Sequence, residues 1–408
     1  MINLIVIELS KRLSKMTKQN IRLKEFDHNV NKIHIPSDSY LRGAPQLDKN
    51  RAYFMSTDEN GFISTGNSFI QDFTIAIVGD SFVENVFVDE ISRFESILER
   101  KFLSNGLRVK VINAGVSGMT GLSAFNLILN KLIKIKPTIV IFVQPSIDFS
   151  ALLFKNGYFN DSKLFANLVP PKEIEKPVFE TLFENKHQIY CNLVLLSTLC
   201  ELNKIDLIVA TCASDSSKRQ LYMMNSILRE ERQNLKYKLL DLDKIFEKGN
   251  ANFYDRQHLN KNGSEKLAEV LFTFIIENFE LGTKKHKNLL LKEYPIQIAK
   301  NFNRQFSQFQ LTGGGENALV ESWLSITTSP LITDTKNEVK EILLHIESEH
   351  EKIDFPFSIN VPLNKTLQQT LDLSRCYPGT YSLSVINFDQ LPVSINDCRV
   401  YSIVNNIE

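Results

Sequence analysis

The chain lacks any excess of charge of one sign. Its 408 residues include 47 Lys and Arg against 47 Asp and Glu. Such a balance gives no overall field that favours nucleic acid. The short basic run 284–287 is more typical of a solvated linker than of a binding site. We therefore expect no nucleic-acid partner.

Long apolar runs are lacking as well. No window approaches the roughly 18 uncharged apolar residues that a membrane helix needs. The apolar stretch within residues 1–8 is too short for a signal peptide, and basic residues follow it rather than precede it. The sequence thus predicts no membrane span and a cytoplasmic location.

Clustered metal ligands and close cysteine pairs are also absent. The five cysteines form no Cys-x-x-Cys pair, and the seven histidines do not gather at ligand spacing. We expect reduced structural thiols and neither a metal nor another cofactor. A disulfide between Cys376 and Cys398 stays open, and the oligomeric state is not encoded in any pattern we recognise.

The middle of the chain alternates between short apolar runs and helical stretches. The apolar runs are near-continuous, as expected for parallel strands that are covered on both faces. Between them, apolar residues recur at helical spacing, for example from Leu122 to Leu132 and again from Leu267 to Phe279. Five such units predict an α/β fold, a three-layer α/β/α sandwich with a five-stranded parallel sheet. The expected strands are 74–78, 108–112, 138–143, 206–210 and 238–242.

The pattern changes after the basic run. Short alternating segments with turn residues between them replace helix-length periodicity, which predicts a C-terminal antiparallel β-sandwich. A chain of this length should hold about two or three domains. We expect residues 1–70 to form an N-terminal extension that packs on the domain after it. The α/β domain should span 71–281, a linker 282–312 and the β-sandwich 313–408.

Residues that can carry chemistry follow the expected strands. The first strand runs into Gly79-Asp80-Ser81, and a serine at the carboxyl end of a strand is a candidate nucleophile. The second strand leads into the glycine-rich segment 113–121, which either presents N–H groups to developing negative charge or simply makes a tight turn. After the fifth strand, Asp255 precedes His258 by three residues, so it can hold one imidazole nitrogen and leave the other for a serine.

Together these segments resemble the SGNH (GDSL-type) hydrolase family over about residues 60–281. The segment 79–81 matches the first block of the family, 113–118 the second and 255–258 the fifth. The resemblance implies a flavodoxin-like α/β hydrolase domain and an ester-hydrolysing activity.

The resemblance also implies a role for each matching residue. Ser81 would be the nucleophile, His258 the general base and acid, and Asp255 the residue that orients His258. The backbone N–H groups of Ser81 and Gly118 would form the oxyanion hole.

One position departs from the family pattern. Family members add an asparagine side chain from a third block, but here Gln144-Pro-Ser-Ile-Asp148 places Ile147 at that position. Isoleucine cannot donate, and losing one oxyanion donor typically costs about 10²–10³ in rate. Three explanations stay open: Ser146 or another side chain supplies the donor, the enzyme works slowly on an activated ester, or the site has become a binding pocket. We expect Asp148 to be an ionised structural carboxylate rather than a donor.

The resemblance leaves the substrate open. A β-sandwich beside an SGNH-like domain looks like a carbohydrate-binding arrangement, so our first expectation is an O-acetyl ester on a saccharide, hydrolysed through a Ser-His-Asp triad and an acyl-enzyme. One alternative is a sugar O-acetyltransferase that uses the same serine. The other is a catalytically weakened binding or assembly protein in polysaccharide metabolism. In each case the expected partner is a small-molecule or saccharide ester.

Overall fold

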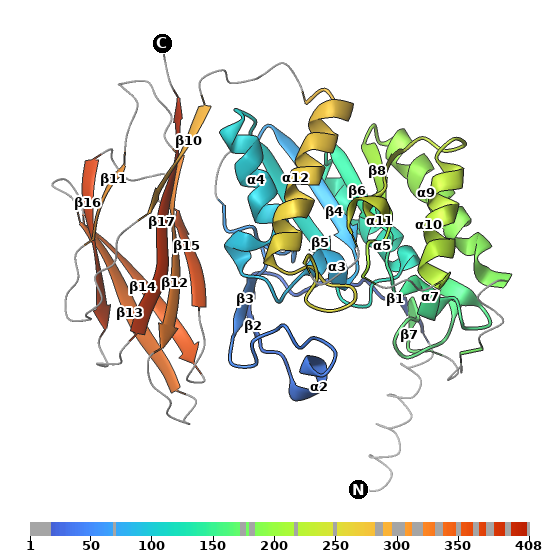
Figure 1. Ribbon diagram of the computed structural model, residues 1–408, viewed down its shortest axis with the longest axis horizontal. Helices are drawn as coiled ribbons and strands as arrows, with labels where there is room; N and C mark the ends of the chain where they lie inside the picture. The colour runs from blue at the N-terminus through green and yellow to red at the C-terminus, as the bar shows by residue number, and fades with distance from the viewer. Residues whose placement is uncertain are drawn as a thin grey trace, which may run out of the picture. The chain divides into compact units, whose positions relative to one another are not determined.

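The five strands expected in the α/β region form one sheet. In the computed structural model its order is β5-β4-β6-β8-β9, which is 2-1-3-4-5 in chain order and thus flavodoxin-like. The pairs β6–β8 and β8–β9 are parallel, and Figure 1 labels β4, β5, β6 and β8 of this sheet. The prediction of a five-stranded parallel sheet with helices is confirmed. Its strands are β4 (Phe73–Gly79), β5 (Val109–Gly115), β6 (Ile139–Val143), β8 (Asp206–Ala210) and β9 (Lys238–Leu240).

The described part of the chain divides into two compact units. The structure describes residues 18–67, 71–171, 177–178, 184–215, 219–247 and 251–281, and beyond them only the backbone of strands β10 to β17. We call the unit of Met1–Phe26, Ala76–Glu84 and Ala114–Lys248 the first unit. The second unit consists of Asp27–Ile75, Asn85–Asn113 and Gly249–Glu408.

Burial explains why the central strands are apolar along their whole length. Every residue of β6 is buried, and so are the last five residues of β4. A strand covered on both faces has no polar face to present to solvent, which selects near-continuous aliphatic and β-branched side chains. Each such side chain contributes about 1.5–3 kcal/mol when it leaves water.

Helices alternate with these strands. In the second unit α4 and α12 lie side by side (Figure 1), with the ring centroids of Phe102 and Phe272 5.2 Å apart. The α12 helix begins at Lys261, because the Asn260 side chain accepts the Gly263 N–H at 2.9 Å and caps the first turn. No helix in the described residues is long and apolar enough to cross a membrane. In the second unit, η1 (Glu90–Ser92) and α4 (Phe94–Ser104) lie between β4 and β5 in the chain, and α12 (Lys261–Asn278) follows β9. The first unit contains α3 (Ser81–Glu84), α5 (Gly121–Leu127), the π-helix η2 (Ile128–Leu132), α6 (Ile133–Ile135), α7 (Asp148–Ala151), η3 (Gly157–Phe159), α9 (His187–Leu202), α10 (Arg219–Glu231) and α11 (Leu242–Ile245).

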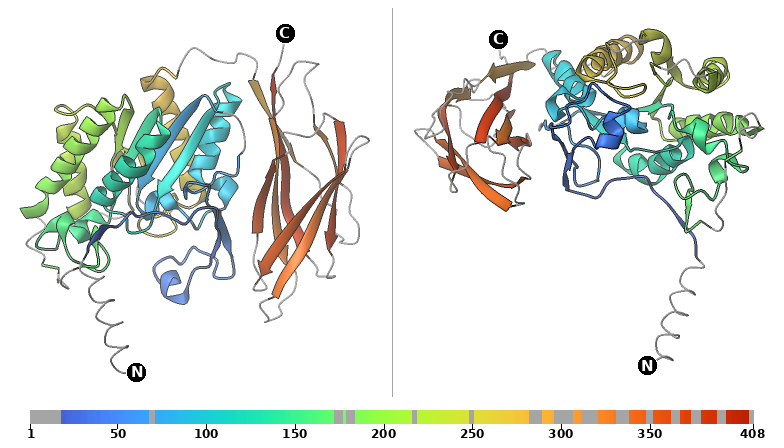
Figure 2. Two further views of the ribbon diagram at one scale, coloured as in Figure 1. Left: turned by 180° about the vertical axis from the view of Figure 1, so that it is seen from behind. Right: turned by 60° about the horizontal axis from the view of Figure 1, so that its bottom comes forward.

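The N-terminal segment contributes short elements to both units. In the first unit β1 (Asn20–Ile21) pairs antiparallel with β7 (Leu168–Val169). In the second unit β2 (Asn31–His34) pairs antiparallel with β3 (Tyr53–Ser56), and the short helix α2 (Asp38–Leu41) falls between them in the chain (Figure 2). Residues 1–17 and 68–70 of the expected extension lie outside the described residues, and its boundary at 70 stays a prediction.

The C-terminal strands pair into two four-stranded antiparallel sheets. Their orders are β10-β17-β12-β15 and β11-β16-β13-β14. The strands β10 and β11 lie within the stretch 282–312 that we expected to be a linker. That the two sheets pack into a sandwich stays a prediction. The strands are β10 (Leu289–Pro295), β11 (Ser307–Leu311), β12 (Glu321–Pro330), β13 (Glu338–Glu347), β14 (Lys352–Val361), β15 (Leu367–Asp372), β16 (Gly379–Asn387) and β17 (Val393–Asn405).

Candidate active site

The candidate nucleophile stands where β4 ends and α3 begins. Ser81 is the first residue of α3 and is partly exposed. Gly79 makes this turn possible, since a Cβ there would lie 2.6 Å from Val83 Cγ2 and 3.2 Å from the Val143 carbonyl oxygen. The strand order reverses between β4 and β6, and open α/β sheets place their sites beyond the carboxyl ends at that switch point.

Asp80 connects the ends of the two strands at this switch point. Its side chain is buried, and Oδ1 accepts the Phe82 N–H at 3.1 Å. Oδ2 accepts both the N–H and the hydroxyl of Ser146, each at 2.8 Å. The carboxylate therefore fixes the turn before Ser81 to the segment that follows β6. The sequence showed Asp80 only as part of the Gly79-Asp80-Ser81 match, and its structural role was not predicted.

The hydrogen bond from Ser146 to Asp80 decides whether Ser146 can replace the missing oxyanion donor. A serine hydroxyl has one proton, and Ser146 gives it to Asp80. Ile147 has no polar side-chain atom, and it precedes α7 without a side-chain cap. As placed, Ser146 therefore has no proton left for an oxyanion, which weakens the first of the three explanations.

Asp148 lies at the centre of a buried hydrogen-bond network rather than in a turn at the surface. Its carboxyl group accepts from the Gly121 N–H at 2.9 Å, from Gln144 Nε2 at 2.6 Å and from the Tyr158 hydroxyl at 2.5 Å. Complete burial raises its pKa to about 7, although these three hydrogen bonds pull in the other direction. The expectation of a structural carboxyl holds, but that of a fully ionised one needs correction. Because of Asp148, the Gly121 N–H is not available to an oxyanion.

The glycine-rich segment begins later than we expected. Asn113, Ala114 and Gly115 belong to β5, because they are buried and the Asn113 carbonyl accepts the Ile63 N–H at 3.0 Å. The turn proper therefore starts after Gly115. Gly118 has φ +71°, which favours glycine, and its N–H makes no hydrogen bond to any other described residue. Both readings of this segment thus apply to Gly118: a tight turn and an unpaired N–H.

Gly115 lets the end of β5 touch the backbone of α3. A Cβ at this position would lie 2.4 Å from the Glu84 nitrogen and 2.7 Å from the Val83 carbonyl carbon. We predict that Gly115→Ala lowers the free energy of unfolding by about 2–3 kcal/mol, because backbone rather than a flexible side chain must move. Urea denaturation would measure the change.

The matched control is Gly43→Ala. Its new Cβ would have the Tyr40 carbonyl oxygen at 3.6 Å as its nearest neighbour, which is ordinary contact. An equal loss of stability in both variants would contradict the close approach of β5 to α3.

The second group of candidate residues lies in the loop before α12. The Asp255 Oδ1 atom accepts the N–H groups of Gln257 at 2.7 Å and of His258 at 2.8 Å, and these bonds shape the loop. Oδ2 lies 2.7 Å from His258 Nδ1. Both side chains are about 85% buried, with exposures of 14% for His258 and 15% for Asp255. Asp255 thus occupies one ring nitrogen and selects the tautomer with a proton on Nδ1, which leaves Nε2 as the acceptor.

The surroundings of Asp255 keep it ionised. Burial alone would raise its pKa, but the hydrogen bond and the charge of His258, together with the N–H groups of Gln257 and His258, outweigh that effect. The net result is a pKa below the ordinary value. A carboxylate at this position can stabilise the imidazolium that forms when His258 takes a proton.

The predicted site residues thus fall into two groups. Ser81, Gly118 and Ser146 belong to the first unit, whereas Asp255 and His258 belong to the second and contact each other. The assembly of the complete triad belongs to the proposal below.

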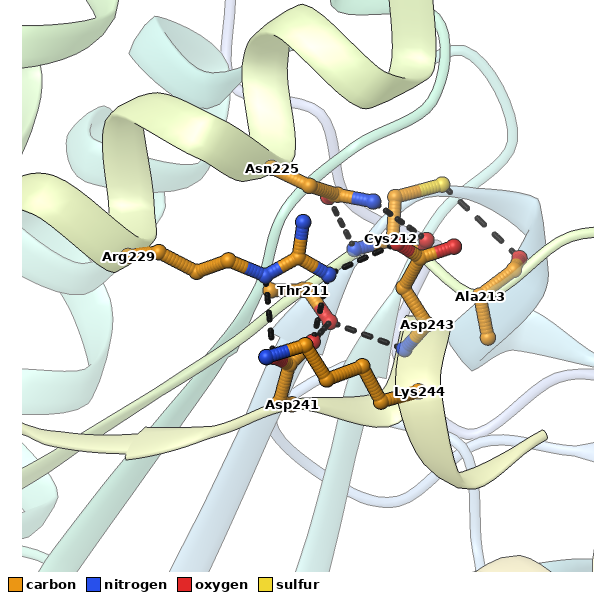
Figure 3. Close-up of polar contacts among 8 residues, drawn as sticks. All are labelled: Thr211, Cys212, Ala213, Asn225, Arg229, Asp241, Asp243 and Lys244. Carbon is orange, nitrogen blue, oxygen red and sulfur yellow. Dashed lines mark hydrogen bonds and ion pairs between the residues drawn. The ribbon is translucent and has the colours of Figure 1, made fainter. Parts of the chain in front are cut away.

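A further polar cluster lies after β8 and β9 (Figure 3). Arg229 donates to Asp241 at 2.7 and 2.9 Å and to Asp243 at 2.7 Å, while the Thr211 hydroxyl donates to Asp241 at 3.1 Å. The charges of this cluster are paired, so its evident role is to hold α10 to the segment after β9. Among the described residues, no group of three or more His, Cys, Asp or Glu side chains could hold a metal ion.

Comparison with known proteins gives matches only among solved structures. No protein-family model and no curated protein matches the chain. The chain is similar to a GDSL-like lipase from Bacteroides thetaiotaomicron, with 12% identity over 50% of this chain and 89% of that one and a TM-score of 0.35. It is also similar to the lipase/acylhydrolase from Enterococcus faecalis (17% identity, 52% and 99% covered, TM-score 0.37) and to an esterase from Pseudoalteromonas sp. (17%, 50% and 98%, 0.38). These three proteins are named as a lipase, a lipase/acylhydrolase and an esterase.

Proposed function

We propose that the chain is a serine esterase of the SGNH type in which Ser81, His258 and Asp255 form the catalytic triad. The observation that carries the proposal is the 2.7 Å contact between Asp255 Oδ2 and His258 Nδ1, which leaves Nε2 to accept a proton. Support for Ser81 comes from its position at the start of α3, directly beyond the carboxyl end of β4 at the switch point of the sheet.

The proposed reaction is acyl transfer in two steps. Ser81 Oγ attacks the ester carbonyl carbon while His258 Nε2 takes the hydroxyl proton, and His258 then gives this proton to the departing alcohol. The acyl-enzyme is released when water attacks it: His258 takes a proton from the water and returns it to Ser81 Oγ, and the carboxylic acid leaves. Asp255 stays ionised throughout and balances the charge of the imidazolium.

Two backbone N–H groups are proposed to bind the oxyanion, those of Ser81 and Gly118. The Gly118 N–H supports this role because it has no hydrogen bond to another described residue. The third donor expected in this family has no replacement at Ile147, and Ser146 is engaged by Asp80. We therefore propose an enzyme whose rate is about 10²–10³ below that of a site with all three donors.

The proposed substrate is an O-acetyl ester on a saccharide. Support comes from the two C-terminal antiparallel sheets, whose strand pairing is compatible with the carbohydrate-binding sandwich we expected. A second candidate is a binding protein that uses the same residues without turnover, and the missing side-chain donor at Ile147 favours it.

Labelling with a fluorophosphonate separates the two candidates. The probe forms a phosphonyl ester only with a serine that a neighbouring base activates. We expect one adduct, which peptide mapping places on Ser81, and no loss of labelling in the surface variant Ser104→Ala. No adduct on Ser81 in the folded protein would favour the binding protein over the esterase. If labelling succeeds, product analysis with and without a sugar acceptor distinguishes hydrolysis from O-acetyl transfer.

A further inference from the structure

A tyrosine from the N-terminal segment lies against the His–Asp pair. Tyr40 belongs to the short helix α2, which Ser37 caps by accepting the Tyr40 N–H at 3.2 Å. Its hydroxyl oxygen lies 3.4 Å from His258 Nδ1 and donates to Asp255 Oδ2 at 3.5 Å. The two sides of this contact are more than 200 positions apart in the chain, and both belong to the second unit.

Aromatic packing fixes the ring of Tyr40 in this place. Its ring centroid lies 5.0 Å from that of Phe87 and 6.5 Å from that of His258. The Tyr254 ring stacks on the imidazole of His258 at 5.5 Å and an interplanar angle of 13°. Tyr40, Phe87 and Tyr254 belong to one apolar cluster with Tyr53. The hydroxyl of Tyr40 is therefore held by a packed ring rather than by a freely rotating side chain.

We propose that Tyr40 is a positioning residue for the His258–Asp255 pair, so that the N-terminal segment is part of the active site. The inference rests on the proposed function, because it assigns Tyr40 a role in the work of His258. The Tyr40 hydroxyl has one proton, and Asp255 Oδ2 can accept it beside the His258 Nδ1–H, because a carboxylate oxygen has two lone pairs. The Tyr254 hydroxyl, 3.4 Å from that of Tyr40, then donates to the Tyr40 oxygen. This second donor strengthens the ionised state of Asp255 and prevents the carboxylate from rotating away from His258.

The expected size of the effect follows from the geometry. Distances of 3.4–3.5 Å are at the long end of the hydrogen-bond range, although catalytic hydrogen bonds in free enzymes are often long and tighten when substrate binds. A hydrogen bond to a charged group that acts through another residue is worth about a factor of three to thirty in rate. Substrate binding does not involve Tyr40 in this proposal, so KM should not change.

The test is Tyr40→Phe, which removes the hydroxyl and keeps the ring. We expect kcat on p-nitrophenyl acetate to fall about three- to thirtyfold, with KM and the thermal midpoint within error of the parent. The matched control is Tyr53→Phe, because the Tyr53 ring lies in the same cluster, 5.5 Å from that of Phe87, and among the described contacts it touches neither Asp255 nor His258. That variant should keep the parent kcat.

A second readout does not depend on turnover. The Nδ1–H proton of His258 is observed by proton NMR in protein labelled with ¹⁵N-histidine and is assigned by its absence in His258→Gln. Tyr40→Phe should shift this resonance and speed its exchange with water, whereas Tyr53→Phe should leave both unchanged. A parent-like kcat, or an unchanged resonance, in Tyr40→Phe overturns the positioning role. If the parent forms no adduct on Ser81 and shows no turnover, the proposed function has failed, and the resonance alone still decides whether Tyr40 holds the pair.

Discussion

Replacing Ser81 with alanine is expected to lower kcat/KM for an activated ester by roughly 10⁴-fold or more, close to the background rate. The reason is that the acyl-enzyme needs an oxygen nucleophile, and alanine offers none. The residual rate would come from the backbone N–H groups at the start of α3 and at Gly118, which still bind an oxyanion when water attacks directly. The measurement is hydrolysis of p-nitrophenyl acetate at saturating and limiting substrate.

Two comparisons make this result interpretable. Ser81 is only partly buried at the first position of a short helix. Ser81→Ala should therefore change the free energy of unfolding by no more than a few tenths of a kcal/mol and the thermal midpoint by about 1 °C. The exposed Ser104, whose hydroxyl donates only to the Lys101 carbonyl, provides the matched substitution Ser104→Ala. Activity equal to the parent in Ser81→Ala would show that the nucleophile is wrongly assigned.

The sequence predicted the sheet well because its strands are buried on both faces. Continuous apolar runs such as 139–143 are short, carry no polar residues and can be placed without knowing their neighbours. Strand ends were harder to place. The sequence predicted the end of β5 at 112, three residues before its observed end at Gly115. Asn113 and Gly115 are residue types common in turns, and only the structure shows their neighbours, Ile63 and the backbone of α3.

The candidate site was predictable where the chemistry is local and not where it is long-range. Asp255 and His258 are three residues apart, so their spacing alone suggested that they could meet. Asp80 and Ser146 are separated by 66 positions, and Tyr40 and His258 by 218, so no periodicity connects them. For Asp80 one signal was available, since an acidic residue between a buried strand and a helix start needs donors when it is buried. For Tyr40 the sequence holds no comparable signal, because tyrosines in turn-rich segments are common.

Asp255→Asn is expected to lower kcat about 10²–10⁴-fold while the loop keeps its shape. The amide oxygen of asparagine can still accept the N–H groups of Gln257 and His258, as Oδ1 does now. At the position of Oδ2, however, an amide NH₂ would face His258 Nδ1 and donate to it. His258 would then carry its proton on Nε2 and could not take one from Ser81.

The pH dependence of stability offers an independent check on the same residue. Because the fold lowers the pKa of Asp255, its ionised form stabilises the folded state above the ordinary pKa of an aspartate, and this contribution disappears as the pH falls through the lower, folded pKa. Asp255→Asn lacks a titrating group, so its stability relative to the parent should be lower at pH 7 and should approach the parent value in acid. Asp58→Asn is the matched control, because Asp58 Oδ1 also accepts two backbone N–H groups, from Asn60 and Phe62, without a histidine partner. Both asparagine variants are also assayed for kcat. If they lost kcat equally, the loss in Asp255→Asn would stem from a change in loop structure, and Asp255 would have no part in setting the tautomer of His258.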